Sequence, residues 1–206
     1  MAPPRGARRS RSTYHHGDLR DALLDAAERA LDRRGTPALA LRAIARAAGV
    51  SHTAAYHHFA DRESLLRAVA TRGFDRLRDA LASAARGAAA GRRGFQEMGV
   101  AYVRFAAEHP ALFRLMFGAD VARGRSRDAA LRTASDGAFQ VLLAGARGLD
   151  RRAPDEVVQQ RAVAAWSVVH GLAGLLLDDQ LSIVGLSLED HDRIARTVLG
   201  SGPPPG

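Results

Sequence analysis

Residues 41–59 have the sequence LRAIARAAGVSHTAAYHHF, and this stretch predicts two short helices joined by a tight turn. In its first half, apolar residues recur at helical spacing, so one face of the first helix is apolar. Gly49 is expected to end this helix, because glycine readily adopts the positive φ favoured at a helix C-terminus. Ser51 is expected to cap the second helix, since its hydroxyl can accept a hydrogen bond from an early backbone N–H. The pattern is typical of a helix-turn-helix, although an ordinary helical hairpin in an all-α core has a similar pattern.

The second helix is predicted to have a small inner face and a polar outer face. Ala54 and Ala55 would let it pack closely on the first helix, while Val50 and Phe59 would close the apolar interior. The residues expected to face outward are His52, Thr53, Tyr56 and His57. A short helix with such an outer face is of the size that enters the major groove of DNA.

Composition limits the classes to which the protein can belong. The chain has 206 residues, 47% of them hydrophobic, which is enough for a substantial core in one or two domains. Cysteine is absent, and this excludes disulfides, cysteine-based zinc sites and thiol nucleophiles. The sequence has no run of about 18 apolar residues and no secretory signal at its basic N-terminus. We therefore expect a cytoplasmic protein with no membrane partner.

Positive charge is concentrated in the part of the chain that holds the helix-turn-helix. Residues 1–76 contain 14 arginines and 8 acidic residues, whereas residues 77–206 contain 16 arginines and 14 acidic residues. Such an asymmetry is expected of a domain that binds phosphates. Residues 1–13 are rich in proline, glycine, serine and arginine, which predicts a disordered basic arm. The arm either contacts DNA or remains a solvated tail.

The remaining sequence predicts helices only, and therefore an all-α fold of about nine helices. Apolar residues at helical spacing mark each helix, and no segment has the alternation of a strand. Besides the two helices of the opening stretch, the predicted helices cover residues 18–34, 61–90, 95–109, 111–117, 128–149, 154–177 and 188–199. Residues 118–127 and 178–187 are predicted to be loops, and residues 201–206 a disordered tail.

The helix-turn-helix stretch and its continuation resemble the TetR family of one-component transcriptional regulators. The matching residues, in order and spacing, are Ile44-Ala45, Ala48-Gly49-Val50-Ser51, Tyr56, Phe59 and Arg62-Glu63-Ser64-Leu65-Leu66. Upstream, residues 14–20 (YHHGDLR) are similar to the start of helix 1 in many members. Downstream, residues 166–171 (WSVVHG) resemble the Trp…His-Gly pattern of a C-terminal subgroup called the WHG type, in which residues 109–113 (HPALF) also have counterparts.

The resemblance implies two domains and a homodimer. Residues 14–62 would form an N-terminal three-helix DNA-binding domain, and residues 63–200 a C-terminal helical bundle for ligand binding and dimerisation. The last two helices would pack against those of the second copy. Most members repress their operators and release them when a small molecule binds.

Two positions depart from the family pattern. Ala40 stands where members usually have a capping Thr or Ser, and Arg62 stands where they usually have Lys. An alanine at a helix N-cap typically costs about 1 kcal/mol. Arginine still reaches a phosphate, and it can do so with two hydrogen bonds, so this change is expected to keep the role.

The expected DNA-binding residues divide into phosphate contacts and base contacts. Tyr56 and Arg62 are candidates for phosphates, and Arg42 for a phosphate or a base edge. His52 and Thr53 would contact base edges from the N-terminal half of the second helix. The complete predicted set is Arg42, Ser51, His52, Thr53, Tyr56, His57, His58 and Arg62.

The C-terminal part contains aromatic residues and methionines that either form plain core or line a ligand pocket between bundle helices. No acidic cluster interrupts these apolar stripes, which favours a hydrophobic or weakly polar ligand over a polycation. Tyr102 and His170 would supply polar groups, and His170 is equally suited to be a core histidine or a dimer contact. The predicted ligand-binding residues are Met98, Tyr102, Phe105, Phe113, Met116, Phe117, Phe139, Trp166 and His170.

No cofactor, metal site or catalytic centre is predicted. The paired histidines, His15-His16 and His57-His58, are poor metal ligands because adjacent helical residues point about 100° apart. Zinc-type spacings do not occur. A Ser-His-Asp set, a phosphate-binding glycine loop and a paired-carboxylate motif are also missing from the sequence, so we do not expect an enzyme.

The sequence thus predicts a ligand-responsive, homodimeric DNA-binding repressor that leaves a palindromic operator when a small hydrophobic effector binds. The alternative is a non-specific architectural DNA-binding protein that uses the arginine-rich N-terminal region. The two differ in their discrimination between DNA sequences, because a regulator prefers its own site by a factor of about 10³ or more.

Overall fold

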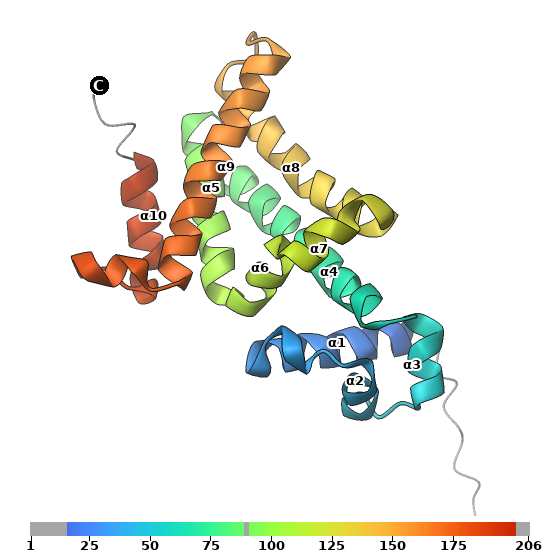
Figure 1. The fold of residues 1–206 in the computed structure, drawn as a ribbon. Helices are drawn as coiled ribbons and strands as arrows, with labels where there is room; N and C mark the ends of the chain where they lie inside the picture. The colour runs from blue at the N-terminus through green and yellow to red at the C-terminus, as the bar shows by residue number, and fades with distance from the viewer. Residues whose placement is uncertain (1–15, 89–90, 201–206) are drawn as a thin grey trace, which may run out of the picture.

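The computed structural model describes residues 16–88 and 91–200, with the side chains of residues 16–18 excepted, and these residues form helices and no strands (Figure 1). The all-α prediction is therefore confirmed, while the predicted arm at 1–13 and tail at 201–206 lie outside the described residues. The α-helices of the described part are α1 (His16–Arg34), α2 (Leu41–Ala47), α3 (His52–His58), α4 (Arg62–Gly87), α5 (Arg92–Glu108), α6 (Pro110–Phe117), α7 (Ala119–Gly124), α8 (Ala129–Leu149), α9 (Asp155–Leu177) and α10 (His191–Gly200). Short 3₁₀ helices are η1 (Thr36–Ala38), η2 (Arg125–Arg127), η3 (Gln180–Val184) and η4 (Leu188–Asp190).

The described residues contain one α-helix more than the sequence predicts. Residues 118–127, predicted as a loop, form α7 and η2 instead. A helix forms there because Val121 is buried against the core, and this burial outweighs the poor helix propensity of the glycines at either end of α7. The predicted loop at 178–187 likewise contains η3, and the last α-helix begins at His191, after η4, rather than at residue 188.

Helices α1, α2 and α3 form a three-helix unit at one end of the molecule (Figure 1). Two predictions about its turn are confirmed. Gly49 has a φ of 70°, and the hydroxyl of Ser51 accepts a hydrogen bond of 3.1 Å from the backbone N–H of Ala54. The buried side chains of the unit are Leu23, Leu24, Ala26, Ala27, Leu31, Leu39, Leu41, Ile44, Ala45, Ala55 and Phe59. This packing holds α3 against the other two helices.

Helix α4 carries the chain from the three-helix unit into the C-terminal part (Figure 1). It begins with a reciprocal cap: the carboxylate of Asp61 accepts from the Ser64 backbone N–H at 2.6 Å, and the Ser64 hydroxyl accepts from the Asp61 N–H at 3.2 Å. The backbone hydrogen bond from Ser64 holds the pKa of Asp61 below its ordinary value, so the cap is intact at neutral pH. The helix then continues without a break for 26 residues.

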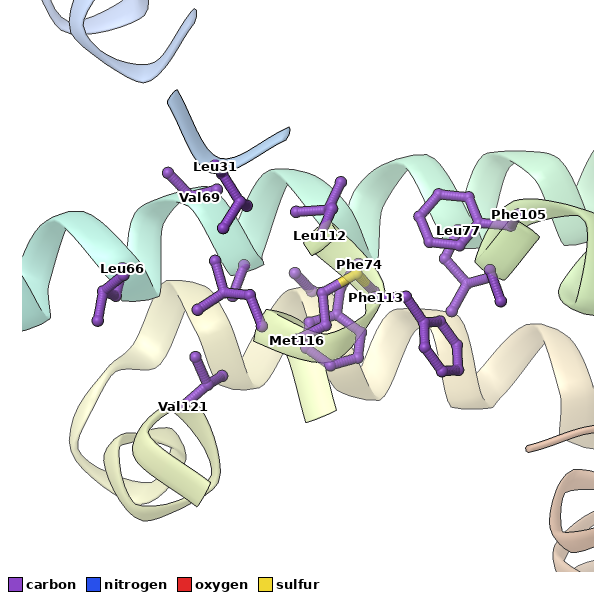
Figure 2. Close-up of a cluster of buried hydrophobic side chains, with 14 of the residues drawn as sticks. Leu31, Leu66, Val69, Phe74, Leu77, Phe105, Leu112, Phe113, Met116 and Val121 are labelled. Atoms are coloured by element: carbon purple, nitrogen blue, oxygen red, sulfur yellow. The ribbon is translucent and has the colours of Figure 1, made fainter. Parts of the chain in front are cut away.

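The buried face of α4 packs against α6, and both contribute to the main apolar core. Figure 2 shows this cluster, in which Leu112, Phe113 and Met116 of α6 lie along the α4 face that carries Phe74 and Leu77. The two helices approach closely because Gly73 has no side chain at their contact. A methyl group at Gly73 would lie 2.5 Å from Sδ of Met116 and 3.1 Å from Cδ1 of Leu112.

Ion pairs join α4 to α1 beside this apolar contact. The guanidinium of Arg72 lies 2.9 Å from Asp21, 2.7 Å from Asp25 and 3.4 Å from Glu28. Arg76 adds a second pair to Glu28 at 2.6 Å. Because most of these groups are partly exposed, each pair contributes little stability alone, but together they fix the angle between the two helices.

We expect Gly73→Ala to lower the free energy of unfolding by about 1–2 kcal/mol, because overpacking against Met116 outweighs the helix propensity gained from alanine. Gly87→Ala is the matched control, since Gly87 lies at the exposed end of the same helix and a methyl group there meets nothing within 4 Å. Chemical denaturation of both variants checks this. Equal stability of the two variants would show that α4 and α6 can separate without cost.

Candidate functional site

Helix α3 presents a continuous polar face to solvent. Its inner side is fixed by Ala55, which is fully buried, and by Phe59, which is buried directly after the helix. His52, Thr53, Tyr56 and His57 are all exposed, and the Tyr56 side chain retains 48% of its accessible surface. Because these residues are spaced one and four positions apart, they share one side of the helix. The structure therefore brings together the four residues predicted to face outward.

The other predicted DNA-binding residues surround this face, but some have contacts within the protein. Arg42 is exposed in the first turn of α2. The hydroxyl of Ser51 is used to cap α3, and His58 is only half exposed. Nη2 of Arg62 donates a hydrogen bond of 2.8 Å to the carbonyl oxygen of Thr36, so this arginine joins η1 to the start of α4.

Helix α2 begins without a side-chain cap, as the sequence predicts. Ala40 occupies the N-cap position with an extended backbone and offers no side-chain acceptor. Its carbonyl oxygen accepts from the N–H groups of Ala43 and Ile44 at 2.9 and 3.0 Å. The exposed position of Ala40 leaves room for a hydroxyl that would cap the remaining N–H groups.

A cavity of about 910 Å³ lies in the C-terminal part, with walls from α4, α5, α8 and α9. Five of the nine residues predicted to bind a ligand line it, namely Met98, Tyr102, Phe117, Phe139 and Trp166. The other apolar lining residues are Phe74, Leu77, Leu81, Phe95, Gly99, Ala138, Leu142, Leu149, Ala165, Val169 and Leu199. Its size is within the range of small-molecule sites.

Four predicted ligand-binding residues do not line this cavity, and we correct their placement. Met116 is fully buried against Gly73, at the contact between α4 and α6. Phe105 is buried with its ring 5.1 Å from that of His109, and the buried Phe113 packs edge-on to Tyr102 at 5.7 Å. His170 lies behind Tyr102, away from the lining. Helical spacing identified these side chains as apolar or interior but not the side of the core they occupy.

Tyr102 is held by two residues of α9. The indole N–H of Trp166 donates to the tyrosine oxygen at 3.1 Å, and Nδ1 of His170 lies 2.8 Å from the same oxygen. Burial raises the pKa of Tyr102 far above its ordinary value and lowers the pKa of His170. The phenol therefore keeps its proton and His170 is neutral, and the two groups share one hydrogen bond whose direction depends on the tautomer of His170. Trp166 and His170 of the WSVVHG stretch thus converge on one residue of α5.

Comparisons with known proteins bear directly on these two sites. A family model described as bacterial regulatory proteins of the tetR family matches residues 23–69, and one described as a tetracyclin repressor-like C-terminal domain matches residues 95–201. The chain belongs to the TetR family. It is accordingly a DNA-binding transcriptional regulator, and α2 and α3 are its helix-turn-helix. Members of this family are typically not enzymes.

Individual relatives cover different shares of this TetR-family regulator. The HTH-type transcriptional regulator BetI of Rhizobium meliloti (strain 1021) is 43% identical over 70 residues, so the match spans only 34% of each chain. A protein with unknown function from Rhodococcus sp. RHA1 is 30% identical, with a TM-score of 0.76 over 94% of this chain and 98% of its own. A putative TetR-family transcriptional regulator from Rhodococcus sp., 24% identical, has the same fold, with a TM-score of 0.60 over 90% of this chain and 96% of its own.

The cavity of this TetR-family regulator also contains polar residues that sequence reasoning missed. They are Arg92, Gln96, Arg125, Ser135, Asp136, Asp150 and Arg161. Several lie at helix ends or in turns, where apolar periodicity carries no signal, and Arg125 lies in the segment predicted as a loop. None of the helices in the described ranges combines the length and apolar character needed to cross a bilayer.

We expect Ala40→Thr to stabilise the regulator by about 1 kcal/mol, because the hydroxyl would cap α2. Ser51→Ala is the mirror change and should destabilise by a similar amount, since it removes the hydrogen bond to the Ala54 N–H. Thermal unfolding of both variants measures the two effects. If Ala40→Thr leaves the stability unchanged while Ser51→Ala lowers it as expected, the start of α2 does not need a cap.

Proposed function

We propose that this TetR-family regulator is a homodimeric repressor that binds a palindromic operator and releases it when a small molecule occupies the cavity. The observation that carries the proposal is the outer face of α3, where four polar or aromatic side chains are exposed while Ala55 anchors the helix. We assign DNA binding to residues 14–62. Ligand binding and dimerisation are assigned to residues 63–200.

Base recognition is assigned to the outer face of α3. Thr53 offers a hydroxyl and a methyl group to base edges, and His52 and His57 offer ring nitrogens. Tyr56 and Arg42 are assigned to phosphates. Arg62 is also assigned to a phosphate. Because its guanidinium already donates a hydrogen bond to the carbonyl oxygen of Thr36, its contact with DNA is coupled to its contact with η1. Ser51 and His58 are assigned supporting roles beside them.

Two substitutions in α3 should separate specificity from affinity. We expect Thr53→Ala to relax the preference at one base pair of each half-site by about 1–3 kcal/mol, because a base contact is lost. Tyr56→Phe should instead weaken binding to all sequences and leave the preference unchanged. Thr133→Ala, an exposed threonine on α8, is the control. Binding is measured by titrating the DNA upstream of its own gene and single-base variants of it.

Competition with unrelated DNA at constant salt tests the alternative function. A repressor should prefer its operator by about 10³ or more, whereas an architectural protein should show no preference. Equal affinity for both DNAs, together with unchanged binding by Thr53→Ala, would assign DNA binding to the arginine-rich N-terminal region instead of α3. That region, including residues 1–13, lies outside the described residues.

The proposed dimer uses α9 and α10. Three apolar side chains of α9 remain well exposed in the single chain: Val163 at 48%, Val168 at 47% and Leu175 at 45%. Gly171 is also exposed, and a methyl group there would meet nothing within 4 Å, so a second helix could approach closely. Val198 of α10 adds a fourth exposed apolar side chain. Large exposed apolar residues clustered on one helix are typical of an interface.

We expect Val168→Arg to convert the dimer into a monomer, because a guanidinium would be buried without a partner at the interface. The monomer should also bind a full palindrome much more weakly, since each copy reads one half-site. Ala144→Arg is the control, as Ala144 is exposed on α8, outside the proposed interface. Sedimentation velocity of both variants gives the answer. A dimeric Val168→Arg variant would place the interface elsewhere.

The effector response is proposed to pass through α6. Phe117, the last residue of α6, lines the cavity, while Leu112 and Met116 of the same helix pack on α4. α6 also contacts α1. A ligand that displaces Phe117 therefore favours a different position of the three-helix unit. It shifts the protein away from DNA only to the extent that it binds the two states unequally.

A further inference from the structure

Arg125 is a cavity residue whose polar groups the protein leaves incompletely paired. It follows α7 directly, and its backbone N–H donates to the carbonyl of Ala122, which fixes its position. Its guanidinium carbon lies 5.5 Å from the ring centroid of Phe74, so it covers an aromatic residue of the same cavity. Nε of Arg125 is buried and has no hydrogen-bond partner. A buried donor in this condition is unfavourable unless an acceptor reaches it.

The acidic residues nearest to Arg125 in the sequence are engaged elsewhere. Asp128 accepts from the Leu131 N–H at 3.0 Å and pairs with Nε of Arg67 at 3.2 Å. Asp120 pairs with Arg123 at 2.5 Å. Within the described residues, no carboxylate oxygen lies within 4.0 Å of the Arg125 guanidinium. The arginine therefore brings an uncompensated positive charge to the cavity wall.

The other charged groups of the lining do not change this conclusion. Asp150 and Arg161 lie 4.0 Å apart and offset one another. Arg92 and Asp136 are both exposed, so water solvates their charges outside the cavity interior. Among the arginines that line the cavity in the described structure, Arg92 and Arg161 are exposed, whereas most of the Arg125 side chain is shielded from solvent.

A continuous row of aromatic rings leads from Arg125 along the cavity. Phe74 packs edge-on against Phe117 at 5.4 Å, Phe117 lies 6.2 Å from Trp166, and Trp166 lies 6.1 Å from Phe139. All four line the cavity. A ligand that extends along this row would keep its body in an apolar environment while its end meets the guanidinium.

We propose that the cavity binds an amphipathic monocarboxylate, whose carboxylate pairs with Arg125 and whose apolar body lies along the aromatic row. A carboxylate accepts charge-assisted hydrogen bonds from the terminal nitrogens of a guanidinium, and both of its oxygens can be engaged at once. This pairing compensates the charge of a guanidinium whose Nε is buried without a partner inside the protein. This inference names the effector class and so rests on the proposed function of the cavity as the effector site.

Titration of the wild-type protein in the absence of DNA tests the ligand class. Trp166 is the single tryptophan of the chain and lines the cavity, so its fluorescence reports occupancy. The probes are decanoate, decanol and decylammonium, which share a ten-carbon chain and differ in head group. We expect decanoate to bind about tenfold more tightly than decanol, and decylammonium to bind more weakly than either. Equal binding of decanoate and decanol, preference for decylammonium, or no binding of any probe would each overturn the proposal.

A matched pair of substitutions tests the role of Arg125. Arg125→Gln should weaken decanoate binding about tenfold and leave decanol binding unchanged. Arg127→Gln, two residues along the same turn and outside the cavity lining, should leave both unchanged. Wild-type affinity for decanoate in Arg125→Gln, or the same loss in both variants, would contradict the assignment. The head-group series on the wild type remains decisive if Arg125→Gln does not fold.

Operator binding in the presence of decanoate separates this inference from the proposed function. If decanoate binds through Arg125 and lowers operator affinity, both are supported. If it binds through Arg125 but leaves operator affinity unchanged, the carboxylate site stands and the release mechanism is rejected. If decanoate does not bind while the operator is still recognised, the carboxylate inference is overturned and the DNA-binding function is retained.

Discussion

The unbroken course of α4 is the constraint on which the rest of the molecule depends. The cap between Asp61 and Ser64 starts the helix, and its first turns contribute Leu65 and Leu66 to the buried core next to the three-helix unit. Further along, Phe74 and Leu77 belong to the C-terminal core and the cavity wall. Each fully buried side chain of this kind contributes about 1.5–3 kcal/mol. One continuous helix thus packs into both parts of the protein, so a movement of either part relative to the other must also move α4.

The second connection between the two parts is made by α6. Gly73 allows this helix to approach α4 closely, and its other contacts reach α1 and the cavity. The ion pairs of Arg72 and Arg76 with α1 add a polar contact beside it. The cavity and the outer face of α3 are therefore separated in space but are connected through packed helices, which is the physical requirement for one site to bias the other.

The cavity is shaped by a small polar network as well as by apolar packing. Trp166 and His170 both contact the Tyr102 oxygen, so the ring of Tyr102 has a fixed position in the wall. The Tyr102 oxygen already has two partners within the protein, so it does not depend on a ligand for its hydrogen bonds. Arg125 is the opposite case, because its Nε is buried and unpaired. The contrast gives the cavity an apolar, rigid side and one end suited to a negative charge.

Local patterns were sufficient for the helix-turn-helix, because caps and helical periodicity depend on residues within one or two turns. Gly49, Ser51 and Asp61 act as their types predict, and the outward residues of α3 follow from the burial of Ala55. The family match over residues 23–69 has the same local origin. The cavity was less accessible to such reasoning: Phe105, Phe113 and Met116 share the periodicity of its lining residues yet pack elsewhere. Helix α7 and the position of Arg125 depend on contacts with α4, which is far away in the chain. The residues next to them in the sequence therefore do not predict either feature.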